Sequence, residues 1–171
     1  MSTPERQGTL FVVATPIGNL SDISERVAKT LAEVALVLAE DTRHTRPLLG
    51  HLGLSKPLAS LHEHNEQGKA DSVIARLAEG QDVALVSDAG TPAVSDPGAR
   101  LVEAVAGAGF GVVPIAGPSA LTTALSACGF SASSSDVRFF GFLPVKGKER
   151  RAGLEKIRDG EGIHVFFESP K

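Results

Sequence analysis

Short apolar runs alternate with segments of helical period along the first 116 residues of the chain. The apolar runs, each predicted to be a buried strand, are residues 9–14, 36–39, 58–62, 83–86 and 111–115. The segments between them, where apolar residues recur at helical spacing, predict helices over residues 22–34, 42–52, 70–78 and 96–106. Strands that are apolar throughout are typical of a parallel sheet covered on both faces. We therefore expect an α/β fold, a five-stranded doubly wound parallel sheet, in a domain spanning residues 1–116.

Local signals predict where some of these helices begin and end. Asp22 and Glu25 have capping-box spacing, with Asp in place of the usual Ser or Thr. Asp96 precedes Pro97, which favours a helix that Asp96 caps. The glycine-rich residues 107–111 follow a helix and precede a strand, the reverse of the order that a phosphate-binding turn requires. They therefore predict a helix C-terminus and turn, and no GxxxxGK[ST] motif occurs elsewhere.

The pattern changes beyond the fifth strand. We expect a helix of small residues at 119–127, a flexible Ser-rich stretch at 131–135, strands at 139–143 and 164–167, and a helix at 149–157. Two strands and about two helices are too few to bury a core of their own. Residues 117–171 are therefore expected to begin a second α/β domain whose remainder is absent.

Composition narrows the class of protein. The apolar runs are far shorter than the ~20 residues that cross a bilayer, and residues 1–9 show no signal-peptide pattern. Cys128, the single cysteine, cannot close an internal disulfide. We therefore expect a cytoplasmic protein with no membrane association. The net charge of −3 argues against a uniformly basic nucleic-acid-binding surface, although basic residues gather at 146–151.

The turns that leave the strands are the predicted functional region, because ligands of such sheets bind beyond the carboxyl ends of the strands. These turns are residues 15–19, 40–43, 62–65, 87–92 and 116–119. Glycine and proline crowd the fourth exit, residues 87–98, and the fifth exit contains Gly117-Pro118-Ser119. Two adjacent backbone-lined turns predict a pocket for an adenosine-like ligand that main-chain hydrogen bonds hold.

Seven segments carry a resemblance to a known family. They are residues 13–24, 39–45, 61–65, 86–98, 114–120, 140–144 and 166–170, in order and at family spacing. On these segments the chain resembles the ribosomal RNA small subunit methyltransferase I family, a branch of the tetrapyrrole methylases, which are class III S-adenosylmethionine-dependent methyltransferases. The resemblance implies 2′-O-methylation of a cytidine ribose in 16S rRNA of the small ribosomal subunit, near the decoding centre. It also implies S-adenosyl-L-methionine as the cofactor, two α/β domains and a homodimer.

The resemblance implies a methyl-donor site in a cleft between the two domains. Carried over by matching position, the cofactor-binding residues are Pro16, Ser87, Asp88, Ala89, Gly90, Val94, Ser119, Ala120 and Phe142. The Gly-Asp-Pro motif of the wider group falls here on residues 89–91, so the carboxylate moves to Asp88. Asp88 is thus either a cofactor contact or a turn-former.

Methyl transfer to a hydroxyl is an in-line displacement. Alignment of the reactants contributes on the order of 7–11 kcal/mol, and a proton acceptor adds ~10²- to 10⁴-fold. The acceptor candidates on strand exits are Glu40, Asp41, His62, Glu63 and His64. We predict Asp41 as the base, with Arg43 holding a phosphate or a carboxylate partner and Glu40 as the neighbouring candidate.

The basic run has two interpretations. Lys146, Lys148, Arg150 and Arg151 either form the solvated start of a helix or contact rRNA phosphates. The family resemblance favours phosphate contact over a purely solvated face.

Other functions stay open. The closest is a methylase of the same group acting on a tetrapyrrole, a corrin precursor or another small acceptor. His62 and His64 lie two apart on a strand with Glu63 between them, which suggests a metal-dependent hydrolase whose third ligand is Asp41 or His44. We expect no metal in the methyltransferase. A non-enzymatic adenosine-binding module is the third alternative. If the second domain supplies half of the cleft, the 171-residue chain is expected to fold and yet to be inactive alone.

Overall fold

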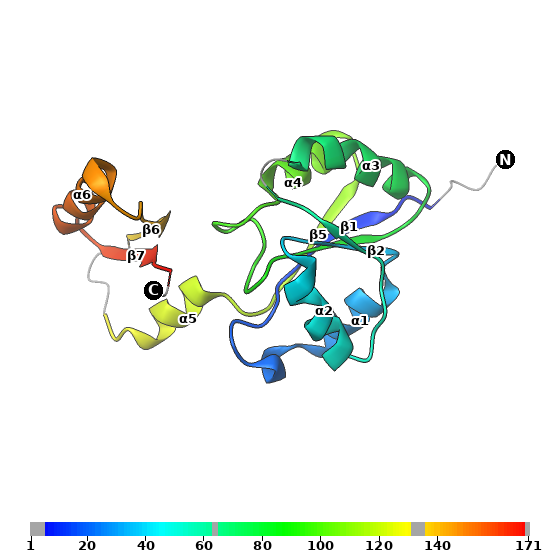
Figure 1. Cartoon of the computed structure of the whole chain (residues 1–171), viewed down its shortest axis with the longest axis horizontal. Coiled ribbons are helices and arrows are strands. Elements are labelled where there is room, and N and C mark those ends of the chain that lie inside the picture. The colour runs from blue at the N-terminus through cyan, green and yellow to red at the C-terminus, as the bar shows by residue number, and fades with distance from the viewer. Residues whose placement is uncertain (1–5, 63–64, 131–135, 170–171) are drawn as a thin grey trace. The chain divides into compact units, whose positions relative to one another are not determined.

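The computed structural model describes residues 6–62, 65–130 and 136–169 (Figure 1). The chain divides into two compact units, one ending at Ser119 and the other beginning at Ala120. Each unit has its own sheet. No helix among the described residues is both long enough and apolar enough to cross a bilayer.

The first unit is built on a five-stranded parallel sheet. Its strands are β1 (Thr9–Val13), β2 (Leu36–Ala39), β3 (Leu58–Ser60), β4 (Val83–Val86) and β5 (Gly111–Ile115). Their order in the sheet is β3-β2-β4-β1-β5. This confirms the predicted α/β fold, since each expected apolar run forms a strand, with the third ending two residues early. Strand β4 lies between β1 and β2, so its exit has neighbours on both sides.

Helices cover both faces of this sheet (Figure 1). Helices α1 (Glu25–Glu33) and α2 (Thr42–His51) lie over one face, and α3 (Glu66–Ala78) and α4 (Ala99–Gly107) lie over the other. Within β2 the side chains alternate between the two cores, with Leu36 and Leu38 on the α3/α4 side. Val37 and Ala39 point to the α1/α2 side. A side chain such as Leu38 contributes about 1.5–3 kcal/mol when fully buried, which explains why β2 and β4, buried at every position, are apolar throughout.

The first helix begins later than predicted. A short 3-10 helix, η1 (Leu20–Asp22), precedes α1, so the capping box expected from Asp22 and Glu25 is wrong. The N-cap is Ser24, whose hydroxyl oxygen accepts a hydrogen bond from the Val27 N–H at 3.2 Å. A serine hydroxyl at this position satisfies one of the otherwise unpaired N–H groups of the first turn.

The cap predicted at Asp96 is also wrong. Helix α4 begins at Ala99, and its N-cap is Gly98 with a φ of 127°, a conformation that favours glycine. The first-turn N–H groups find their acceptor on α3, in the carboxylate of Glu66, as described below. Helix α3 in turn begins at Glu66, earlier than its apolar period indicates.

The end of α4 confirms the interpretation of residues 107–111 as a helix C-terminus and turn. The helix ends at Gly107, and Gly109 has a φ of 85°. The Gly109 N–H donates to the Ala106 carbonyl at 3.0 Å, and the Phe110 N–H donates to the Val105 carbonyl at 3.2 Å. These bonds satisfy the last carbonyls of the helix, and β5 starts directly afterwards.

The second unit contains α5 (Ala120–Ala127), β6 (Val137–Phe142), α6 (Gly147–Arg158) and β7 (Ile163–Phe167). Strands β6 and β7 form a parallel pair. Large apolar side chains stay accessible, including Val145 at 89% and Phe130 at 72% exposure, as expected for so few elements. The Ser-rich stretch predicted to be flexible, residues 131–135, lies outside the described residues.

Candidate functional site

The exits of β1, β2, β4 and β5 lie at one edge of the first unit's sheet, because the strands are parallel and in register. Residues 87–98, which leave β4 and lead to α4, are called the β4-exit loop below. This loop occupies the middle of the edge. Such an edge is where ligands of open α/β sheets bind.

The β1 exit and the β4-exit loop are joined by backbone hydrogen bonds. The Thr15 N–H donates to the Gly90 carbonyl at 2.8 Å, and the Gly90 N–H donates to the Thr15 carbonyl at 3.1 Å. The buried hydroxyls add to this link: Thr15 Oγ1 donates to the Ser87 carbonyl and Ser87 Oγ to the Gly90 carbonyl, both at 3.2 Å. Ser87, predicted to contact the cofactor, thus uses its hydroxyl to build the loop.

The β5 exit joins the same loop. Thr91 Oγ1 donates to the Pro118 carbonyl at 3.2 Å. Gly90 has a φ of 87°, and a Cβ there would lie 3.4 Å from Ile17 Cγ2 and 3.8 Å from the Pro118 oxygen. The three exits therefore approach closely at Gly90, where glycine adopts the left-handed backbone without the strain that a Cβ would add.

Two residues of the β4-exit loop have strained backbones. Ala93 has a φ of 65° and Ser95 a φ of 63°, in the left-handed region that costs roughly 1–2 kcal/mol for a residue with a Cβ. Such strain persists only where the surrounding structure holds it, and it clusters at binding and catalytic sites. The loop is therefore a candidate binding element on geometric grounds alone.

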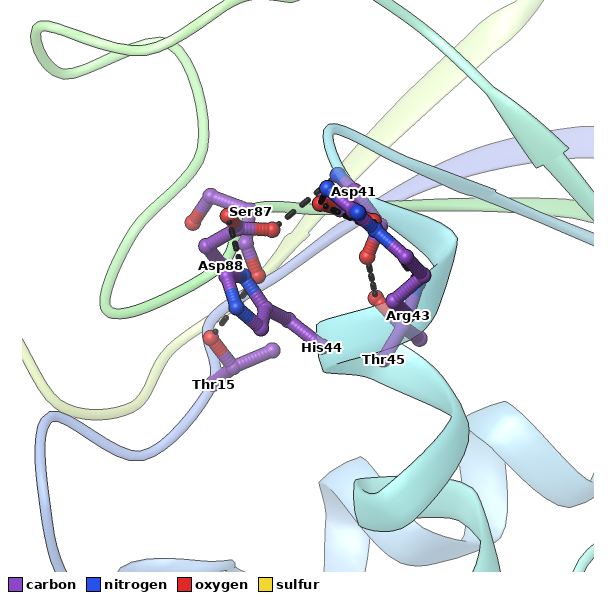
Figure 2. A network of polar contacts seen from close by, with 7 residues as sticks. All are labelled: Thr15, Asp41, Arg43, His44, Thr45, Ser87 and Asp88. Carbon is purple, nitrogen blue, oxygen red and sulfur yellow. Dashed lines mark hydrogen bonds and ion pairs between the residues drawn. The ribbon is translucent and has the colours of Figure 1, made fainter.

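Asp88 links the β4-exit loop to the β2 exit, as Figure 2 shows. Its Oδ1 accepts the Asp41 N–H at 3.0 Å, and its Oδ2 lies 2.7 Å from His44 Nδ1. Both carboxylate oxygens therefore face the β2 exit. This geometry favours the turn-forming role of Asp88, whereas its contact with a cofactor stays a prediction.

Asp41 caps α2 and holds Arg43. One carboxylate oxygen accepts the Arg43 N–H at 2.8 Å, and both oxygens lie 3.0 Å from Arg43 Nε. The hydrogen bond from the Arg43 side chain, with that from its backbone, lowers the pKa of Asp41 to about 2. A carboxylate with so low a pKa is a weak proton acceptor at neutral pH. The role of Asp41 as the base stays a prediction, and this geometry weighs against it.

Glu40 has the opposite electrostatic environment. Burial raises its pKa, and the nearby charges of Asp96 and Asp88 raise it further. The pKa of Asp96 is raised as well, chiefly by burial. Both carboxyls therefore hold a proton more readily than an ordinary Asp or Glu side chain does, as a proton acceptor requires. Of the two predicted catalytic carboxyls, Glu40 is the one whose pKa is raised, whereas the pKa of Asp41 is lowered.

Glu66 is a residue of this region that the sequence analysis missed. Its side chain is only 4% exposed, and its two oxygens accept the Gly98 N–H at 3.0 Å and the Arg100 N–H at 3.1 Å. It therefore fixes the end of the β4-exit loop and the start of α4. No local signal could have identified it, because the carboxylate lies on another helix.

The remaining predicted cofactor-binding residues divide between the two units. Pro16 follows Thr15 on the β1 exit, and Ala89 and Val94 belong to the β4-exit loop. Ser119 lies on the β5 exit, and the first unit brings these three exits together. Ala120 opens α5 and Phe142 ends β6, both in the second unit. Phe142 is 53% exposed, and its ring lies edge-on to the Phe167 ring with 5.4 Å between the ring centroids.

The predicted RNA-binding residues lie at the start of α6 in the second unit. Lys146 is the N-cap residue, and Lys148 and Arg151 are exposed in the first turns. Arg150 differs: it pairs with Glu168 at 2.5 Å and donates to the Pro144 carbonyl at 3.1 Å. Its guanidinium thus joins α6 to the end of β7, whereas its neighbours face solvent.

The structure lends no support to the metal site. Glu63 and His64 lie outside the described residues, and His62 is exposed with its Nε2 3.1 Å from Asn65 Nδ2. Among the residues that are described, no three or more His, Cys, Asp or Glu side chains gather as a metal site would require.

Comparison with known proteins gives one family. The sequence model of the tetrapyrrole (corrin/porphyrin) methylases matches residues 9–171. A protein named ribosomal RNA small subunit methyltransferase I from Pseudomonas aeruginosa is 52% identical over 163 residues, which cover 95% of this chain and 57% of that protein. The protein of the same name from Escherichia coli O157:H7 is 50% identical over 168 residues, covering 98% and 58%. The chain thus spans less than two thirds of these curated relatives, and the resemblance seen in its motifs is confirmed.

Solved structures agree on the fold. The uroporphyrin-III-C-methyltransferase of Thermus thermophilus matches with a TM-score of 0.58 at 20% identity, covering 78% of this chain and 60% of that one. A putative cobalamin synthesis related protein from Corynebacterium diphtheriae matches with a TM-score of 0.59 at 14% identity, covering 85% and 69%. At these identities the likeness concerns architecture.

Proposed function

The chain belongs to the tetrapyrrole methylase family, and from that membership we propose that it is the methyl-donor-binding part of an S-adenosylmethionine-dependent rRNA methyltransferase. The observation that carries this proposal is the convergence of three strand exits on Gly90. The names of the relatives at 52% and 50% identity support the rRNA substrate. Because those relatives are longer, the activity of the whole protein is part of the proposal.

The residues of the first unit fit an adenosine-like donor. The hydroxyls of Thr15, Ser87 and Thr91 donate to carbonyls within the loops and so hold them in place. Gly90 and Gly117 let the strand exits pack closely, since a Cβ on Gly117 would lie 3.0 Å from Ala14 Cβ. We propose that these closely packed exits present main-chain groups to the ligand. Bound there, S-adenosylmethionine would supply an electrophilic methyl group on its sulfonium.

The β2 exit would serve the acceptor hydroxyl. We assign Glu40 as its proton acceptor, because the raised pKa of that carboxyl makes it a better base than Asp41. Asp41 holds the Arg43 guanidinium. Arg43 is exposed, and its guanidinium suits contact with a phosphate of the RNA. These residues would orient the ribose and take up its proton while the methyl group transfers to oxygen.

The finer assignment follows the family resemblance. We propose the 2′-oxygen of a cytidine in 16S rRNA as the acceptor, the small ribosomal subunit as the partner and a homodimer as the assembly. Lys146, Lys148 and Arg151 are proposed to contact rRNA phosphates, because they are exposed on one short stretch. Arg150 has a carboxylate partner in the structure and is proposed to support that stretch.

The test has a binding stage and a transfer stage. The chain is irradiated with methyl-tritiated S-adenosylmethionine and the labelled peptide is sequenced. Label on the β4-exit loop, or on the β1 and β5 exits beside it, supports the donor site, and label confined to other parts of the chain overturns it. Transfer is measured on unmethylated 30S subunits, with the chain alone and with a hybrid that adds the remaining C-terminal length of the Pseudomonas relative. We expect transfer by the hybrid only. Digestion of the rRNA should yield 2′-O-methylcytidine, and any other methylated nucleoside, or labelled small acceptor, would contradict the assignment.

A further inference from the structure

The link between Asp88 and α2 connects the two halves of the proposed site. We propose that His44 is a positioning residue: as an imidazolium paired with Asp88, it holds the Glu40–Arg43 turn against the β4-exit loop. The catalytic consequence rests on the proposed function, whereas the link itself does not. His44 belongs to none of the predicted catalytic or cofactor-binding residues.

Geometry supports the link directly. His44 Nδ1 donates to Asp88 Oδ2 at 2.7 Å, a length typical of a charge-assisted hydrogen bond. The other oxygen of Asp88 accepts the Asp41 N–H at 3.0 Å. One carboxylate from the β4 exit is thus oriented by the backbone and the helix of the β2 exit. The two strands are neighbours, with Ala39 paired to Val86, so the link closes directly beyond the sheet.

The charges around His44 favour its protonated form. Asp88 faces it from the β4-exit loop, and Asp41 and Arg43 face it from its own turn and helix. The hydrogen bond from the imidazole to Asp88 is the largest cause that raises the pKa of His44; the charge of Asp41 also raises it, and that of Arg43 opposes both. A raised pKa means that the ion pair is fully formed below the ordinary value of 6.5 and is lost as pH rises through the raised value.

The consequence for the reaction is alignment. Glu40 and Asp41 are adjacent in the chain, so a link at the Asp41 N–H also restricts the Glu40 carboxyl relative to the β4-exit loop. Small misplacements of a reacting group cost up to on the order of 10²-fold in rate. His44 would therefore act on turnover more than on donor binding, and it would set the alkaline limit of activity while Glu40 sets the acidic one.

The first experiment tests the link in the 171-residue chain by NMR. The His44 ring and the Asp41 amide are followed from pH 5 to 9, with His51→Gln, at the far end of the same helix, as the matched control. We expect both signals to titrate with one shared pKa, unaltered in the control, and the Asp41 amide transition to vanish in His44→Gln. An Asp41 amide that titrates equally in His44→Gln would overturn the link.

The second experiment tests the positioning role in the hybrid enzyme. We expect His44→Gln to lower kcat about tenfold, to leave the KM for S-adenosylmethionine unchanged, and to remove the alkaline fall of the kcat profile. His44→Lys, which keeps a positive charge, should restore kcat without that fall. A KM effect with unchanged kcat, or a persisting alkaline fall, would overturn the role. If the unaltered chain fails to bind S-adenosylhomocysteine while the NMR coupling persists, the proposed function fails and the link stands.

Discussion

Glu66 is expected to determine how firmly the β4-exit loop is held, and replacing it tests the structural basis of the site. Its buried carboxylate accepts two N–H groups, from Gly98 at the end of the loop and from Arg100 in the first turn of α4. In Glu66→Gln the volume is kept, but one acceptor becomes an NH2 group that faces a donor. A buried donor left without a partner costs about 1–3 kcal/mol.

This cost converts into a measurable shift. With a urea m-value of about 2 kcal/mol/M, the unfolding midpoint should fall by about 0.5–1.5 M. The titration is followed by the NMR signals of β1 and β4, which report on the first unit alone. Glu103→Gln, an exposed change on α4, is the control and should leave the midpoint in place. Affinity for S-adenosylhomocysteine should fall in Glu66→Gln only. An unchanged midpoint in Glu66→Gln would refute the capping argument.

Three further predictions concern charge. Glu40→Gln should raise the urea midpoint at pH 7 and not at pH 4. Burial raises the pKa of Glu40 above its ordinary 4.5, so the ionised carboxyl of the unaltered chain lowers stability as pH rises through the raised value. An equal effect at both pH values would contradict this. The same variant should abolish the acidic limb of kcat, whereas Asp41→Asn should preserve it, as pH–rate profiles would show. The double variant Lys148→Glu/Arg151→Glu should weaken rRNA binding and reduce its salt slope by about 0.7–0.9 for each phosphate that is no longer neutralised. Arg150→Glu should mainly lower stability. Equal salt slopes for the double variant and the unaltered protein in filter binding would contradict the phosphate contacts.

The strands β2 and β4 were predictable because they are buried on both faces. Residues 36–39 and 83–86 are apolar throughout, and the alternation of their side chains between two cores leaves no polar position. Helix starts were predicted less well, since caps depend on which acceptor is near in space. Asp96 has the right residue type, yet the N–H of Gly98 is paired with Glu66, 32 residues away.

The candidate site was also only partly predictable from the sequence. The family resemblance predicts that the β4-exit loop binds the cofactor, which stays a prediction. The glycine pattern of the loop indicated close backbone approach, and the structure shows this at Gly90. Our proposal of Glu40 over Asp41 rests on the structure, because the two adjacent carboxyls differ in what surrounds them. The Arg43 guanidinium lowers the pKa of Asp41, and burial raises that of Glu40. The contact of Asp88 with His44 spans 44 residues and leaves no sequence pattern.

A crystal structure of the chain grown with S-adenosylhomocysteine tests most directly the claim that the β4-exit loop holds the methyl donor. We predict the ligand against the main chain of residues 87–94 and beside Ser119, with its sulfur directed toward Glu40. A ligand bound at another edge of the sheet, or no ligand from millimolar solution, would contradict the claim.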